Sequence, residues 1–443
     1  MTISRRNFIK TSGIATTGIA LGGLALSARS YGNVLGANDQ LNIAVMGTNS
    51  RGHWLSDGFA QSDNTHISHI CDVDKRVIEK TSAMIMKKYG YQPQGEKDYR
   101  KVLKDKDVDI VVIVAPDHWH APASIMALQA GKHVYVEKPC SHNPKEGELL
   151  VQAQKKYGKV VQMGNQQRSA METLEAMQLI NEGAIGEVYY GKAWYSNSRG
   201  SIGTGQLASV PEWLDWELWQ GPAPRREYKD NIVHYNWHWF QNWGTGEILN
   251  NGTHEVDICR WALGVDYPVK VTSNGGRFHF QDDWEFYDTQ NANFEFEAGK
   301  MINWEGRSCN SFNINQKGRG ASIHGTKGTF VLDRSGYQMY DNSNKLIKEA
   351  LSSNRSNTAD LVGGGNMDLV HFDNFLKAIR LGEKQNSPID EGHKSVLLCQ
   401  LGNVAQKTGK TLHCDPSNGH IMNNSEAMKM WGREYETGWE LKV

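Results

Sequence analysis

The sequence predicts an α/β protein of two domains, in which a doubly wound parallel sheet is followed by a second α/β domain with a mostly antiparallel sheet. Three observations support this prediction. From Leu41 to about residue 164, short apolar runs alternate with segments of helical periodicity. Residues 47–52 place two glycines directly after the first apolar run. From 267 to 350, strand-like alternation is interrupted by glycine turns.

The first domain is expected over residues 41–164. Segments 74–89 and 122–130 have helical periodicity, and Pro122 is expected in a first helical turn, where its missing N–H is not needed. Right-handed crossovers between parallel strands then give a doubly wound domain. The expected strands are 41–46, 66–71, 108–114, 133–136 and 159–163.

The second domain is expected over residues 165–415, with a C-terminal extension at 416–443. Segments such as 293–297 and 329–332 alternate apolar and polar residues, which indicates a sheet with one polar face. Two helices at about 367–407 close the domain, and the pattern leaves open whether they pack back on the first domain. An open sheet favours pairing between subunits, so we expect a homo-oligomer.

Composition excludes several classes of protein. Among the 443 residues, 48 Lys and Arg stand against 49 Asp and Glu without a basic stripe, which argues against binding of nucleic acid. The six cysteines form no CxxC pair, so neither a zinc knuckle nor a dense disulfide framework is indicated. His118 and His120 have no acidic or thiol partner at a suitable spacing, and no metal is expected.

The N-terminus has the layout of an export signal. Arg5 and Arg6 precede an uncharged stretch at 11–26 that is too short and too rich in glycine for a stable membrane span. The pattern resembles a twin-arginine signal over residues 1–30, with Ile9 where leucine is usual. We therefore expect export to the periplasm or cell envelope. The alternative is an amphipathic structural helix.

A glycine-rich turn follows the first predicted strand and opens a helix. Its sequence fits G-x-N-x-x-G, and backbone amides in such a turn reach a pyrophosphate at the helix N-terminus. Asp72 follows the last glycine by 20 positions, where a carboxylate accepts hydrogen bonds from ribose hydroxyls and repels a 2′-phosphate. NAD is therefore favoured over NADP, although a plain strand-to-helix turn is the alternative. The candidate cofactor residues are Gly47, Asn49, Ser50, Arg51, Gly52 and Asp72.

Two further motifs follow the third and fourth predicted strands. They are the PDHWH segment at 116–120 and the EKP triplet at 137–139. With these motifs, residues 41–415 resemble the glucose-fructose oxidoreductase, inositol dehydrogenase and MocA family. The resemblance implies a Rossmann domain, a second domain with a large open-faced sheet, a nicotinamide cofactor, and a sugar or cyclitol substrate.

The same resemblance implies roles for individual residues. Lys138 is implied beside the nicotinamide and the substrate hydroxyl. Asn165 and Gln166 are implied near the nicotinamide carboxamide and ribose. The alternatives are a solvated lysine and a turn-capping Glu137. The residues implied to line the cofactor are Pro116, Asp117, His120, Glu137 and Lys138.

Residues 246–257 resemble the family segment G-x-x-x-D-x-x-x-H-x-x-D, with Asn250 in place of the first aspartate. Oxidation of a carbinol carbon requires a base near the hydroxyl, and Lys138 and His254 are the catalytic candidates. Asn250 removes a carboxylate that often tunes the lysine, which puts the simple proton relay in doubt. A capped core histidine is the alternative role for His254.

Six tryptophans lie between positions 213 and 243, among histidine, tyrosine and asparagine residues. Indoles pack against the C–H faces of pyranose rings, which predicts a sugar site. A loop held together by its own aromatic side chains is the alternative. The candidate substrate contacts are Arg168, Trp237, His238, Asn250 and His254.

The function predicted from these features is an exported, NAD-dependent oxidoreductase acting on a hydroxyl or keto group of a sugar or glycoside. A compartment with little free NAD implies a tightly held cofactor. The first alternative is a redox-assisted glycosidase or lyase working through a transient 3-keto sugar, and the NAD-using glycosidases of that kind lack the lysine of the EKP triplet. The second alternative is a non-catalytic protein that binds a sugar.

Overall fold

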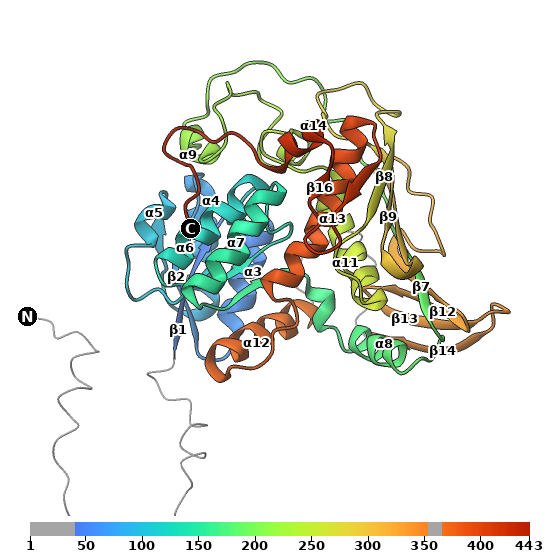
Figure 1. Cartoon of the computed structure of the whole chain (residues 1–443). Coiled ribbons are helices and arrows are strands. Elements are labelled where there is room, and N and C mark those ends of the chain that lie inside the picture. Colours follow the sequence, from blue (N-terminus) through green and yellow to red (C-terminus); the bar gives the residue numbers. More distant parts are fainter. Residues whose placement is uncertain (1–39, 353–365) are drawn as a thin grey trace, which may run out of the picture. The chain divides into compact units, whose positions relative to one another are not determined.

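A parallel sheet of six strands forms the first domain of the computed structural model, which describes residues 40–352 and 366–443 (Figure 1). The strand order is β3-β2-β1-β4-β5-β6, and every pairing is parallel. This confirms the predicted doubly wound domain. The predicted signal at 1–30 lies outside the described residues. The elements are β1 (Leu41–Met46), α3 (Arg51–Gln61), β2 (Thr65–Cys71), α4 (Lys75–Tyr89), β3 (Gln94–Glu96), α5 (Tyr99–Val102), β4 (Ile110–Ile113), α6 (Asp117–Gln129), β5 (His133–Val136), α7 (Pro144–Tyr157) and β6 (Val161–Met163).

Helices cover both faces of this sheet, which explains why its central strands are continuous apolar runs. All four side chains of β4, Ile-Val-Val-Ile, are buried. Ile110 and Val112 pack with Phe59 of α3 on one face, whereas Val111 and Ile113 belong to the core that Leu150 of α7 shares on the other. The sheet is therefore a rigid base, and the carboxyl ends of its parallel strands all lie at the same edge.

A mostly antiparallel sheet of ten strands forms the second domain. Its order is β14-β13-β12-β11-β7-β10-β9-β8-β15-β16, and β7 and β10 are its one parallel pair within the described residues. The predicted second sheet is confirmed. The elements are η2 (Gln166–Ser169), α8 (Met171–Asn181), β7 (Val188–Ser196), α9 (Trp216–Gln220), η3 (Asn236–Trp239), α10 (Glu247–Asn250), α11 (Gly252–Leu263), β8 (Lys270–Gly276), β9 (Thr289–Glu295), η4 (Glu297–Gly299), β10 (Met301–Arg307), β11 (Arg319–Gly325), β12 (Gly328–Asp333), β13 (Gly336–Asp341), β14 (Leu346–Leu351), α12 (Asn366–Leu381), α13 (Ile389–Thr408), β15 (Leu412–Cys414), β16 (Ile421–Met422), α14 (Ser425–Met428) and η5 (Lys429–Trp431).

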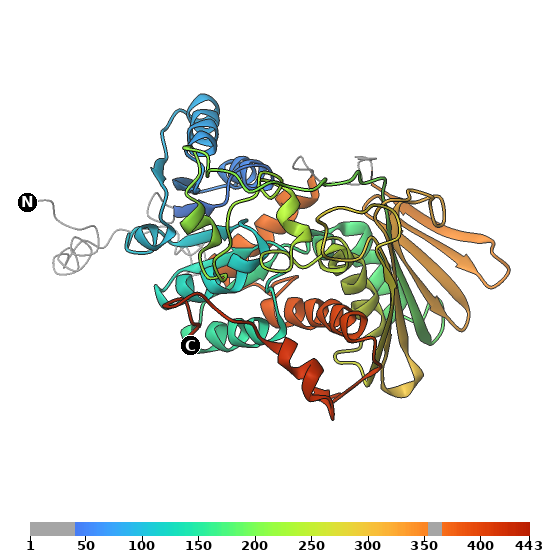
Figure 2. The ribbon, with the colours of Figure 1, turned by 90° about the horizontal axis from the view of Figure 1, so that it is seen from above.

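The described helices that pack on the large sheet lie on one of its faces (Figure 2). α11 packs on β7, β10 and β11, while α13 packs on β8 and β9. The other face carries polar pairs such as Lys192 Nζ with Glu305 Oε2 at 2.7 Å and Asn303 Nδ2 with Asn293 Oδ1 at 2.9 Å. The pairing of subunits through this face stays a prediction. Among residues 40–352 and 366–443, no helix is long and apolar enough to cross a membrane.

The two terminal helices join the domains. Phe372 of α12 stacks on Phe59 of α3, with ring centroids 4.1 Å apart, so α12 completes the core on one face of the parallel sheet. α13 lies between α7 of the first domain and α11 of the second (Figure 1). The described residues from Leu41 onward thus pack as one unit.

The prediction for α6 was wrong at its N-terminus. The helix begins at Asp117, and Pro122 lies inside it rather than in its first turn. A proline at this position leaves the carbonyl of His118 without its helical donor. The guanidinium of Arg433 donates to that oxygen at 2.8 Å, which compensates for the missing bond.

Candidate active site

A cavity of about 580 Å³ lies at the carboxyl ends of the parallel strands, within the usual range for small-molecule sites. The first domain contributes the turn after β1, the end of β2 and the loops after β4 and β5. The second domain contributes α10, α11 and β11. The predicted site residues that line it are Gly47, Asn49, Ser50, Arg51, Gly52, Asp72, Pro116, Asp117, His120, Glu137, Lys138, Gln166, Trp237, His238, Asn250 and His254.

The glycine turn after β1 leaves room for a ligand beside the backbone. Gly47 has a φ of +84°, and a Cβ there would lie 2.7 Å from the amide nitrogen of Ala115. A Cβ on Gly52 would lie 1.8 Å from the carbonyl oxygen of Gly47, so both glycines are required by close packing. The side chain of Ser50, the N-cap of α3, forms no capping bond. The first amides of α3 are therefore available to a pyrophosphate, and the turn fits a dinucleotide.

Asp72 follows β2 at the edge of this turn. Its carboxylate accepts hydrogen bonds from the amides of Thr48 at 2.6 Å and Asp74 at 3.0 Å, which fixes both oxygens beside the glycine loop. Burial raises the pKa of this carboxyl, while the two amides act in the opposite direction. A fixed carboxylate at this position fits ribose hydroxyls and opposes a 2′-phosphate.

Glu137 organises the floor of the cavity at the end of β5. Its Oε1 accepts from Arg51 Nε at 3.2 Å and from Gln166 Nε2 at 3.1 Å. Arg51 also forms a bidentate pair with Asp368 of α12, at 2.6 and 2.9 Å. Glu137 is therefore held by two neighbours and joins α3 to η2.

Lys138 points to the second domain. Its Nζ donates to the backbone oxygen of Asn250 at 2.6 Å and to Asn250 Oδ1 at 3.1 Å. Burial lowers the pKa of Lys138, and the positive charges of Arg334 and Arg319 act in the same direction. An ammonium with two of its three protons engaged has one left for a ligand.

His254 lies in the first turn of α11 and is buried, with its ring at the cavity. Burial holds the pKa of His254 well below its ordinary value, and the charges of Arg334 and Lys138 lower it further. The imidazole is therefore neutral near pH 7 and has a free lone pair that can accept a proton.

The loop after β4 is fixed by internal contacts. The two ring nitrogens of His120 lie 2.6 Å from the carbonyl oxygens of Ala115 and Pro139, so the ring bridges the loops after β4 and β5. Asp117 Oδ2 accepts from Thr245 Oγ1 at 2.5 Å. These two predicted cofactor residues therefore hold the two loops and the second domain together while they line the cavity.

Residues 213–237, which we call the strap, cross the ends of the parallel strands from the second domain. Asp215 forms an ion pair with Lys97 at 2.8 Å, and His234 Nε2 lies 2.9 Å from Asp74 Oδ2. The guanidinium of Arg76 lies 3.5 Å from the ring centroid of Trp213. The strap thus closes the part of the cavity next to Asp72.

The tryptophan cluster divides into two groups. Trp216, Trp219 and Trp243 pack against one another in a separate apolar cluster, as expected for a loop held by its own aromatic side chains. Trp237 lines the cavity and stacks on His238 with centroids 3.6 Å apart. Burial lowers the pKa of His238 to about 3. Trp119, Trp219 and Trp237 are the three indoles of the described residues at the cavity.

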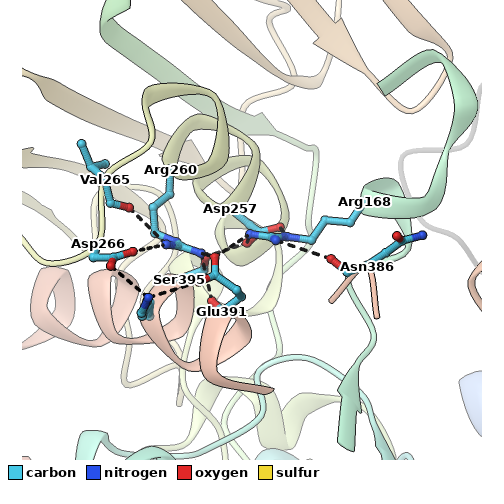
Figure 3. A network of polar contacts seen from close by, with 9 residues as sticks. Arg168, Asp257, Arg260, Val265, Asp266, Asn386, Glu391 and Ser395 are labelled. Carbon is cyan, nitrogen blue, oxygen red and sulfur yellow. Dashed lines mark hydrogen bonds and ion pairs between the residues drawn. The ribbon is translucent and has the colours of Figure 1, made fainter. Parts of the chain in front are cut away.

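Two residues predicted to contact a ligand do not line the cavity. Arg168 does not line the cavity, because Asp257 binds its guanidinium in a bidentate pair at 2.7 and 2.8 Å (Figure 3). Ser395 donates to the same carboxylate at 2.6 Å and accepts from Arg260 at 2.8 Å. This buried network ties η2 to α11 and α13. Asn165 is buried outside the cavity, and its amide has no hydrogen-bond partner in the described part of the chain.

Three arginines at the cavity were not predicted. Arg199 pairs with Glu247 at 2.7 Å, and Arg319 pairs with Glu255 at 2.8 Å. Arg334 lies in the turn between β12 and β13. Each comes from a strand end or loop, where only the register of the sheet decides which way a side chain points. No group of three metal-ligating side chains occurs among residues 40–352 and 366–443.

Solved structures share this architecture. Levoglucosan dehydrogenase in complex with NADH and levoglucosan superposes with a TM-score of 0.64 at 19% identity, covering 84% of this chain and 99% of that one. The WlbA dehydrogenase of Bordetella pertussis, in complex with NADH and UDP-GlcNAcA, gives 0.63 at 17% identity, covering 85% and 99%. At these identities the similarity shows the fold.

Curated relatives match part of the sequence. A glycosyl hydrolase family 109 protein of Shewanella pealeana is 28% identical over 211 residues, which are 44% of this chain and 46% of that protein. A second, from Shewanella putrefaciens, is 29% identical over 161 residues, 35% of each chain. The chain thus aligns with less than half the length of these relatives.

Family models match almost the whole described chain. A model of an oxidoreductase family, described as an NAD-binding Rossmann fold, matches residues 41–165. A model of the C-terminal α/β domain of the same family matches residues 187–441. The first domain is therefore an NAD-binding Rossmann domain, and the chain belongs to the Gfo/Idh/MocA oxidoreductase family.

Proposed function

We propose that this protein is an NAD-dependent oxidoreductase that oxidises a hydroxyl group of a sugar or glycoside, or reduces the corresponding keto group. The observation that carries the proposal is the cavity itself. Lys138 from the first domain and His254 from the second both line the space into which the glycine turn and Asp72 also open. A cofactor site and two groups able to move a proton thus share one enclosure.

Both candidate groups can take part in moving the hydroxyl proton. Lys138 retains one donor for a substrate oxygen after its two bonds to Asn250, and so it can orient the hydroxyl. When Lys138 is neutral it can itself accept the hydroxyl proton. Neutral His254 has a lone pair and can accept this proton directly or from Lys138. NAD, when bound, accepts the hydride from the carbon that carries the hydroxyl. Glu137, Arg51 and Gln166 keep the floor of the site in place.

The strap supports a tightly held cofactor. It is attached to the first domain through Asp74, Lys97 and Arg76, on the side of the cavity next to Asp72. A dinucleotide bound there leaves only after these contacts separate, so we expect slow release. Trp213→Ala removes the indole under Arg76 and is expected to speed up NAD dissociation, measured by dilution of NADH-loaded protein with fluorescence detection. Unchanged release would argue against retention by the strap.

The relatives from glycosyl hydrolase family 109 favour a second candidate. In a redox-assisted glycosidase, a transient 3-keto sugar loses the proton on C2 and the glycosidic bond breaks by elimination. Water then adds to the resulting unsaturated ketone, and the keto group is reduced again. Lys138 and His254 would serve the same first oxidation. This chain retains Lys138, which fits simple oxidation better.

One experiment separates the two candidates. The nucleotide is released from purified protein by denaturation and identified, and the NAD-loaded protein is then incubated with p-nitrophenyl glycosides and with the free sugars. NADH formation together with a keto sugar supports the oxidoreductase. Release of p-nitrophenol without net NADH supports the glycosidase. Lys138→Met and His254→Gln should remove either activity, and turnover unaffected by both would overturn the proposal.

A further inference from the structure

With one exception, each arginine at the cavity forms an ion pair with a carboxylate of the described chain. Arg319 pairs with Glu255 at 2.8 and 3.1 Å, and Arg51 pairs with Asp368. Arg199 pairs in the same way with a glutamate of α10. An arginine that is paired with a carboxylate of the protein does not need an anionic ligand to balance its charge.

Arg334 is the exception. It lines the cavity with Lys138 and His254, and no carboxylate of residues 40–352 or 366–443 forms an ion pair with it. The nearest carboxylate in sequence, Asp333, is engaged elsewhere: it accepts from Ser335 at 2.6 and 2.9 Å and pairs with Lys317 at 2.7 Å. Arg334 is therefore a positive charge of the cavity without a counterion in the described chain.

The turn that carries Arg334 is fixed in place. Gln167 of η2 donates to the backbone oxygen of Asp333 at 3.2 Å, which ties the turn to the loop after β6. Gly336 has a φ of +127°, and a Cβ there would lie 2.0 Å from the carbonyl oxygen of Ala350. The guanidinium is thus presented from a rigid hairpin rather than from a free surface loop.

The positive charges around the cavity disfavour a charged guanidinium that has no counterion. Burial and the nearby charges of Arg319 and Arg51 lower the pKa of Arg334 to about 9, against the weaker opposing effect of Glu255. Lys138 adds a further positive charge, and within the described residues its ammonium donates hydrogen bonds to the neutral groups of Asn250. An anion beside Arg334 would relieve this repulsion, whereas a neutral ligand would leave it.

We propose that the substrate is a sugar with a negatively charged substituent, a carboxylate or a sulfate ester, and that Arg334 binds this substituent. The inference rests on the proposed function and names the substrate class of the same site. A guanidinium offers planar, paired donors that match either group, and such charge-assisted bonds are stronger than neutral ones. Arg334 is then the residue that distinguishes charged sugars from neutral ones.

The test compares charged and neutral probes on the NAD-loaded full chain. Methyl β-D-glucuronide, D-glucose 6-sulfate and methyl β-D-glucoside are titrated by calorimetry, and NADH formation is followed with each. We expect one of the anionic probes to bind at least about 10-fold more tightly than the glucoside. A hydrogen bond to a charged group contributes at least the binding free energy that corresponds to this change in affinity. The better of the two identifies the carboxylate or the sulfate as the preferred group.

Variants then assign the preference to Arg334. Arg334→Gln should abolish this preference by weakening the binding of the anionic probe, and Arg334→Lys should restore part of it. The matched control is Arg307→Gln on the outer face of β10, which should change nothing. The substitution of Arg334 removes no ion pair in the described chain, so the variant is expected to fold.

Three outcomes would overturn the inference. The first is that the anionic probes bind no better than the glucoside, or not at all. The second is that the preference for the anionic probe persists in Arg334→Gln. The third is that Arg334→Gln loses affinity for NAD instead, which would make Arg334 a cofactor contact. Failure of the proposed function is recognised separately, because the purified protein would then neither hold NAD nor change its redox state with any probe.

Discussion

Replacing Asn250 by aspartate tests whether Lys138 handles the proton. The new carboxylate would lie where Asn250 Oδ1 lies, 3.1 Å from Lys138 Nζ. Two unit charges at this distance attract by about 1 kcal/mol in water and by about 5 kcal/mol at an effective dielectric constant of 20. At 1.36 kcal/mol for each pKa unit, this range corresponds to a rise of about 1 to 4 in the pKa of Lys138. Desolvation of the new carboxylate offsets part of it, so we expect a rise of about 1 to 3.

The sign of the kinetic effect follows from the task of the lysine. A base must be neutral to take the hydroxyl proton, and a raised pKa keeps Lys138 charged up to a higher pH. In Asn250→Asp, the rising limb of kcat/KM against pH should therefore move to higher pH by about 1 to 3, and the rate below that limb should fall about 10-fold for each unit. The assay follows NADH formation at saturating NAD.

The matched control for this variant is Asn303→Asp on the outer face of β10, where a new carboxylate lies away from the cavity. Its profile should coincide with that of the unmodified protein. A limb that stays within about 0.3 pH units in Asn250→Asp would refute the role of Lys138 and leave His254 as the group that titrates.

Three further predictions concern the buried network, the cofactor and export. Asp257→Asn removes the bidentate carboxylate from the buried guanidinium of Arg168, which is left with a longer ion pair to Glu391 at 3.7 Å. This should lower the free energy of unfolding by about 3 to 5 kcal/mol in urea titrations, whereas Glu305→Gln in the partly exposed pair of the outer face should lower it by less than about 1 kcal/mol. Equal losses would contradict the burial argument. Asp72→Ser should weaken NAD binding about 10-fold and reduce the ratio of NAD affinity to NADP affinity, both measured by fluorescence titration. An unchanged ratio would mean that another group recognises the ribose hydroxyls. Replacing both Arg5 and Arg6 by lysine should leave the protein in the cytoplasm of cells with a twin-arginine translocase, as seen by fractionation, and normal export of the variant would exclude that route.

The parallel sheet could be predicted closely because a strand covered on both faces must be apolar throughout. β1 and β5 have the predicted bounds, and the first glycine turn follows β1 as expected. The start of α6 could not be found in this way. Its interior Pro122 is tolerated because Arg433, 315 positions after His118, supplies the donor that the helix lacks.

The candidate site was predictable where a motif fixes the direction of a side chain. Lys138 follows a strand end and His254 begins a helix, so both positions point to a known edge of the fold. Arg334 has no such motif, because it belongs to the β12–β13 hairpin. The place of this hairpin in the sheet follows from the pairing of β12 with β11 and of β11 with the distant strand β7. Only the assembled sheet brings its side chain to the cavity.

α11 shows how one helix serves both chemistry and architecture. His254 and Asp257 lie three residues apart, about 60° around the helix, and this rotation sends one to the cavity and the other to Arg168. Asp257 is therefore unavailable as a partner for the imidazole, and Glu255 is equally occupied by Arg319. With the carboxylates of α11 committed to arginines, His254 is the side chain of this helix that can receive the proton of the substrate, alongside Lys138 from the first domain. This is why the charge of the residue at position 250 should control the pH dependence of the reaction.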